Sequence, residues 1–104
     1  SRWLIEITNK GFVPENVKLK QYDSLTFINK DTKPHEIVDV DEKCPSVNTS
    51  RALVPNETFS VTFIEAGICT YSEAKDDDWG GVITIEELTK EEIKERQGDS
   101  EEEK

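Results

Sequence analysis

The chain has 104 residues, and its 23 acidic residues outnumber 13 basic ones to give a net charge of −10. Apolar residues make up 34% and charged residues 35%, which at this length allows one hydrophobic core and one folded domain. The negative charge disfavours nucleic-acid phosphates, and no stretch approaches the roughly 20 apolar residues of a bilayer-crossing helix, so we expect neither nucleic-acid binding nor a membrane-spanning segment.

Short β-rich runs follow one another along the first 85 residues. Several of them alternate apolar and polar side chains, as where Phe59, Val61 and Phe63 alternate with hydroxyl residues. This period of two places one face of a strand in a core and the other in water. Glycine and proline separate the runs, as in a sandwich or a small barrel. The predicted strands are residues 3–8, 16–20, 24–29, 36–40, 58–64, 68–72 and 81–85.

Helix signals replace strand signals near the end of the chain. Thr89 and Glu92 have the spacing of a capping box, and Leu88 and Ile93 occupy the two positions of a hydrophobic staple. These signals predict a helix that begins at Lys90.

The tail is expected to be short and acidic. Gly98 can end the helix in a left-handed conformation, which predicts a helix over residues 90–97 and a disordered segment over residues 99–104. The chain then divides into a β-domain, residues 1–86, and a tail, residues 87–104. Nine acidic and four basic residues give positions 86–104 half of the net charge.

Two groups of residues, in a fixed order, carry a resemblance to a known family. The first group is Phe12-x-Pro14-x-x-Val17-x-Leu19, Leu25-Thr26-Phe27-x-Asn29-x-Asp31 and His35. The second group is Leu53-x-Pro55-x-x-x-Phe59-Ser60-x-Thr62-Phe63 and Gly67-x-Cys69-x-Tyr71. Over residues 3–85 the chain resembles the cupredoxins, the family of plastocyanin and azurin. The resemblance implies an antiparallel Greek-key β-sandwich, here followed by a short C-terminal helix.

The resemblance also implies four copper-ligand positions, of which this chain keeps one. His35 matches the first histidine, whereas Glu73 falls at the cysteine, Asp76 at the second histidine and Trp79 at the methionine. A blue-copper centre needs a thiolate and two imidazoles. We therefore expect a domain that has lost the blue-copper site, with no cofactor and no enzymatic activity, that acts as a structural or protein-interaction module.

Two alternatives involve a metal. If the family's loop geometry survives, His35, Glu73 and Asp76 converge at one end of the sandwich, and their imidazole and carboxylates suit divalent zinc, copper, manganese or iron. A metal-binding protein is thus the second hypothesis, and copper electron transfer is the third. The acidic run 76–78 lacks the spacing of a calcium-binding EF-hand and favours a solvated loop.

Trp79 is the candidate interaction residue. As a large aromatic beside two glycines, it is either an exposed anchor for a protein partner or a plug for the space that copper would fill. The sequence does not name that partner.

The cysteines and two glycosylation sequons bear on the compartment. Cys44 and Cys69 either pair as a disulfide in an oxidising compartment or stay thiols in the cytosol. Asn48-Thr49-Ser50 and Asn56-Glu57-Thr58 match the acceptor pattern for N-glycosylation and lie in predicted loops. These features favour an extracytoplasmic protein that is secreted, periplasmic or on the outer face of a membrane.

Overall fold

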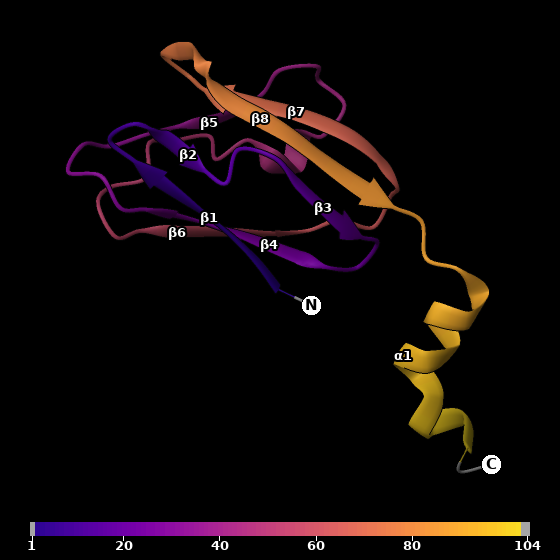
Figure 1. Cartoon of the computed structure of the whole chain (residues 1–104). Helices are drawn as coiled ribbons and strands as arrows, with labels where there is room; N and C mark the ends of the chain where they lie inside the picture. The colour runs from indigo at the N-terminus through magenta and orange to yellow at the C-terminus, as the bar shows by residue number, and fades with distance from the viewer. Residues whose placement is uncertain (1, 103–104) are drawn as a thin grey trace.

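Two four-stranded sheets form a β-sandwich in the computed structural model, which describes the backbone of residues 2–102 and the side chains of residues 3–96 (Figure 1). One sheet has the order β2-β1-β4-β6 and the other β3-β8-β7-β5. The strands are β1 Arg2–Thr8, β2 Gly11–Val13, β3 Val17–Lys20, β4 Ser24–Asn29, β5 Ile37–Asp39, β6 Thr58–Thr62, β7 Gly67–Glu73 and β8 Asp76–Glu86. A single 3-10 turn, η1 Pro45–Val47, lies between β5 and β6, and helix α1 Lys90–Glu102 follows β8. The predicted sandwich is confirmed.

The two sheets are mixed rather than purely antiparallel. β1 pairs with β4 in parallel, β3 pairs with β8 in parallel, and the remaining pairs are antiparallel. Parallel neighbours cannot be joined by a hairpin and need a crossover connection. The chain makes the first crossover by passing from β1 through β2 to β3 in the other sheet before it returns to β4.

Aromatic rings fill the centre of the core. Phe12, Phe27 and Tyr71 meet edge to face with ring centroids 4.9 to 6.1 Å apart, a favoured arrangement for aromatic pairs. The Tyr71 hydroxyl donates a hydrogen bond to the Glu15 carbonyl at 2.6 Å, and burial raises the pKa of Tyr71. Aliphatic residues from both sheets complete the core: Ile5, Ile7, Val17, Leu19, Leu25, Ile37, Val47, Leu53, Val61, Ile83 and Ile85.

Two adjacent glycines let β8 approach its neighbours closely. A Cβ atom on Gly80 would lie 2.1 Å from the Tyr71 carbonyl oxygen, and one on Gly81 would lie 1.8 Å from the Glu15 carbonyl oxygen. No side chain fits at either position. The glycines therefore allow β8 to lie close to β7 at Gly80 and to the segment of Glu15 and Asn16 at Gly81.

β8 begins five residues earlier than predicted, at Asp76, and two residues, Ala74 and Lys75, separate it from β7. The expected acidic segment is exposed as predicted, but the three consecutive aspartates belong to the first part of β8 rather than to a loop. Aspartate has low strand propensity, and of the three only Asp76 pairs with β7, opposite Glu73, whereas residues 77–79 have no partner on that strand. The pairing shifts register between Ser72 and Glu73, as at a β-bulge.

The predicted capping box of α1 is confirmed. The Glu92 N–H donates to the Thr89 hydroxyl and the Thr89 N–H donates to the Glu92 carboxylate, both at 3.0 Å. Lys20 lies 2.9 Å from the Glu92 carboxylate, and buried Leu88 donates its N–H to the Gln21 side chain. These contacts fasten the first turn of the helix to the sandwich.

The predicted end of the helix is wrong. The backbone is helical through Gly98 to Glu102. A glycine inside a helix costs only about 1 kcal/mol relative to alanine, so Gly98 alone does not end it. Disorder was expected from residue 99; residues 99–102 are helical instead, and residues 103 and 104 lie outside the described residues. α1 extends away from the sandwich (Figure 1). In the described part of the chain, no helix has the length and apolar character needed to cross a bilayer.

Candidate functional site

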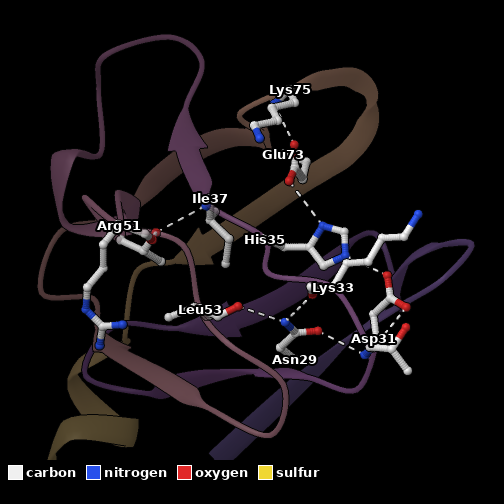
Figure 2. A network of polar contacts seen from close by, with 11 residues as sticks. Asn29, Asp31, Lys33, His35, Ile37, Arg51, Leu53, Glu73 and Lys75 are labelled. Atoms are coloured by element: carbon white, nitrogen blue, oxygen red, sulfur yellow. Dashed lines mark hydrogen bonds and ion pairs between the residues drawn. The ribbon is translucent and has the colours of Figure 1, made fainter.

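His35 is buried at one end of the sandwich with a carboxylate at each ring nitrogen. Its Nδ1 lies 3.1 Å from Glu73 Oε2 and its Nε2 lies 2.7 Å from Asp31 Oδ2 (Figure 2). The side chains of His35, Asp31 and Glu73 are 9%, 8% and 7% exposed. We call these three residues the histidine clamp. The His35 backbone is fixed as well, because it exchanges two hydrogen bonds with Leu53 at 3.0 and 2.7 Å.

Asn29 positions the loop that carries Asp31 and His35. Alternate residues of β4 are buried, and Asn29 follows Leu25 and Phe27 in this pattern, so its amide side chain is fully buried. Its Nδ2 donates to the carbonyls of Lys33 and Leu53 at 2.8 Å, and its Oδ1 accepts the Asp31 N–H at 2.9 Å (Figure 2). Asn29 thus holds the loop in the conformation that places Asp31 beside the imidazole.

The two carboxylates of the clamp have partners on both oxygens. The second oxygen of Asp31 accepts the Thr32 N–H at 2.7 Å, and that of Glu73 accepts the Lys75 N–H in the β7–β8 turn. The hydrogen bond from His35, followed by that from the Thr32 N–H, lowers the pKa of Asp31. Asp31 therefore keeps its negative charge beside the imidazole at neutral pH.

The clamp determines what the imidazole can do. A neutral imidazole has one N–H donor, so two hydrogen bonds to carboxylates require either an imidazolium or a proton on one carboxyl group. In both cases each nitrogen of His35 is engaged. No ring lone pair is then free to bind a metal ion.

The three predicted metal ligands come together only in part. His35 contacts Glu73, whereas Asp76 lies exposed on β8 at the wall of the same cavity. Asp31 and Glu73 lie at opposite ring nitrogens and so do not face one common point. Among the described residues, no three His, Cys, Asp or Glu side chains are grouped so as to hold a metal ion. Metal binding by this set stays a prediction.

The residues at the four copper-ligand positions do not fit blue copper. The His35 nitrogens are occupied, Glu73 and Asp76 offer hard oxygen ligands, and an indole has no lone pair comparable to a thioether's. Cys44 and Cys69, the only cysteines of the chain, are joined in a disulfide with Cα atoms 5.8 Å apart, so neither offers a thiolate.

Trp79 lies against the clamp. It is half-buried, packs on the hydrophobic core, and its ring centroid is 5.3 Å from that of His35 with the planes inclined by 32°. On the other side, a Cβ atom on Gly11 would come within 4.0 Å of the indole. Trp79 therefore fills space between β2 and the imidazole.

A cavity of about 960 Å³ opens beside the clamp at this end of the sandwich. Three segments form it: the β1–β2 turn, the loop between β4 and β5, and the β7–β8 hairpin. Its lining consists of Thr8, Asn9, Lys30, Asp31, Thr32, Lys33, Pro34, His35, Glu73, Lys75, Asp76 and Trp79. The cavity thus gathers four more charged residues, Lys30, Asp31, Lys33 and Lys75, than the three site residues expected from the sequence.

Several residues of the site were missed as site residues. The alternation of buried residues in β4 indicated that Asn29 would be buried. Asp31 stands four residues before His35, close enough for a local contact. Nothing in the sequence signalled that Lys30, Lys33 and Lys75 share one cavity, because two loops far apart in the chain supply them.

Solved structures with this fold include copper proteins. A copper(I) structure of an amicyanin mutant is 21% identical over 81% of each chain with a TM-score of 0.71. A second reduced amicyanin mutant, at pH 4, is 19% identical over 83% of each chain with a TM-score of 0.71. The copper-containing nitrite reductase NirK of Thermus scotoductus SA-01 is 18% identical over 86% of this chain and 23% of that one, with a TM-score of 0.75. Neither a scan of family models nor a search of curated proteins finds a match. The fold is that of the cupredoxins.

Proposed function

We propose that this cupredoxin-fold chain is a protein-interaction module that functions without blue copper and without catalysis. The observation that carries the proposal is the histidine clamp, in which Asp31 and Glu73 engage both nitrogens of His35. A copper-binding histidine must present a lone pair to the metal, and here hydrogen bonds to carboxylates take the place of that bond.

The hairpin at the same end supports the proposal. Only Ala74 and Lys75 connect β7 to β8, so the segment that corresponds to the family's ligand loop forms the irregular first part of β8, with Asp76 paired to Glu73 and residues 77–79 unpaired. Trp79 packs against His35 and the core, which favours its role as a plug over that of a fully exposed anchor. Its remaining exposed surface still faces the cavity.

An oxidising compartment is the proposed setting. Disulfides persist in secreted and periplasmic proteins and are rare in reducing cytosol. The Cys44–Cys69 bond joins the loop before η1 to β7 and is consistent with that location. We therefore propose an extracytoplasmic protein.

A copper titration tests the proposal. We expect no intense absorption near about 600 nm when Cu(II) is added to the purified chain, because the thiolate that gives blue copper its colour is missing. We also expect no saturable heat from Cu(II) or Zn(II) in calorimetry, and the same result for His35→Ala.

Either alternative would give a different result. An intense band in that region would contradict the proposal and favour copper electron transfer. A saturable one-to-one isotherm that His35→Ala abolishes would instead favour a metal-binding protein that uses His35, Glu73 and Asp76. Glu73→Ala is the variant matched to His35→Ala: it removes the other side of the same contact and leaves the imidazole in place, with no carboxylate at His35 Nδ1.

A further inference from the structure

We propose that the cavity beside the histidine clamp binds an anion with several carboxylate or phosphate groups through Lys30, Lys33 and Lys75. The inference deepens the proposed function by giving the chemistry of what the module recognises. It rests on that function in one respect, namely that no copper occupies this end of the sandwich.

Three ammonium groups that form no ion pair with a described residue carry the argument. Lys30 and Lys33 come from the β4–β5 loop and Lys75 from the β7–β8 turn, and all three line one cavity. Within the described residues none of them forms an ion pair. This is notable in a chain with 23 acidic residues, where Lys20, for example, lies 2.9 Å from Glu92.

The acidic residues of the cavity offset these lysines only in part, although Lys33 is near enough to Asp31 to help lower its pKa. Both oxygens of Asp31 and of Glu73 are bonded to His35 or to backbone N–H groups, and both side chains are less than a tenth exposed. Asp76 is the only acidic lining residue that is exposed. The three lysines carry three positive charges, Asp76 one negative charge and the buried clamp one net negative charge, so the lining keeps a small positive excess in a chain whose net charge is −10.

The uncharged lining adds hydrogen-bond donors and an apolar wall. The indole N–H of Trp79, the Asn9 amide and the Thr32 hydroxyl make no hydrogen bond within the described residues. The cavity, at about 960 Å³, is at the upper end of the size range of small-molecule sites. Such a donor-rich lining fits a ligand rich in acceptors, either a free small anion or an acidic segment of a protein partner, and it disfavours a metal cation.

A titration followed by NMR tests the proposal, with the ¹⁵N-labelled full chain at an ionic strength of about 0.01 M. The probes are citrate and a hexaglutamate peptide. We expect a saturable shift of the Trp79 indole resonance and of the amides of residues 30–35 and 73–76. Trp3 is an internal control, because it lies at the end of β1 away from the cavity-lining Thr8.

Charge-removing variants sharpen the test. We expect Lys30→Gln/Lys33→Gln to weaken the affinity for the bound probe by about tenfold or more, since two favourable charges are lost. The matched control, Lys18→Gln/Lys43→Gln, removes the same charge outside the cavity and is expected to bind as the unmodified chain does. Preserved Trp79 and His35 resonances in both variants verify the fold.

The outcomes are distinct. Binding of citrate alone supports the proposal with a small anion as ligand, and binding of the peptide, alone or with citrate, supports it with an acidic partner segment. Shifts that do not saturate, that affect Trp3 equally, or that the control variant weakens as much would overturn it. That failure leaves the proposed function intact as long as copper gives no intense band, whereas such a band overturns the proposed function itself.

Discussion

The two ends of the β-sandwich differ in how far their paired charged side chains are buried. At the cavity end, His35 and its two carboxylates are buried and bonded to one another and to the backbone. At the end where α1 docks, the helix side chains are partly exposed: Glu92 pairs with the partly exposed Lys20 at 2.9 Å, and Arg96 pairs with the buried Asp23 at 3.3 Å. Removing one partner of a buried charged pair is costly, whereas exposed ion pairs contribute little. The comparison indicates that the cavity end is part of the global fold and that α1 is a separable attachment.

Glu73→Ala tests the cavity end and has the largest expected effect. It removes one carboxylate of the buried clamp and the acceptor for the Lys75 N–H, so we expect a loss of about 3 kcal/mol in the free energy of unfolding. Urea denaturation measures it. Glu73→Gln keeps the volume and an acceptor and is expected to lose less; equal stability of Glu73→Ala and the unmodified chain would contradict a structural role for the clamp.

Removing the Cys44–Cys69 disulfide is expected to destabilise the sandwich. Cys44→Ser/Cys69→Ser opens a link between residues 25 apart in sequence. The chain-entropy model predicts a loss of about 3 kcal/mol, measured by thermal or urea unfolding. Intact mass after alkylation without reductant is the control, because uptake of two labels by the unmodified protein would show that the bond is not formed.

Thr89→Ala tests the α1 end. It removes the hydroxyl that accepts the Glu92 N–H, so we expect the helix to lose about 1 kcal/mol. Amide hydrogen exchange should accelerate in α1 and stay unchanged in β4 and β7. Faster exchange throughout the sandwich would show that the two ends are coupled.

Lowering the pH should weaken the attachment of α1 to the sandwich, and this is the smallest of the expected effects. The Thr89 N–H, followed by the Lys20 ammonium, lowers the pKa of Glu92 in the folded state. This stabilisation is therefore present above the ordinary glutamate pKa and is lost as the pH falls through the lowered value. Helix chemical shifts recorded from pH 6 to about pH 3 follow the loss, which begins below about pH 4. Lys20→Gln should shift the transition to higher pH, and an unchanged midpoint would contradict the role of this ion pair.

Local signals predicted most of the fold. Alternation in residues such as Leu25 and Phe27 located the strands, and Thr89 with Glu92 located the start of α1, because these patterns depend on neighbours in sequence. The start of β8 was missed because three consecutive aspartates carry no local strand signal and only Asp76 among them pairs with β7. The helix continued past Gly98 because one glycine is a weak signal.

The site was less predictable than the fold. The resemblance identified His35 and Glu73 as neighbours, and the structure brings them into contact. The role of Asp31 depends on how Asn29 fixes the loop, a contact with the distant Leu53 that no local pattern encodes.

The two-residue turn between β7 and β8 makes this end of the scaffold open to redesign. Ala74 and Lys75 are both exposed, and the core residues of the two strands lie further along them. Insertions at exposed turn tips are generally tolerated. A longer segment that carries new side chains could therefore be inserted after Lys75, which keeps its N–H bonded to Glu73, so that a different recognition chemistry is added here while the sheets keep their register.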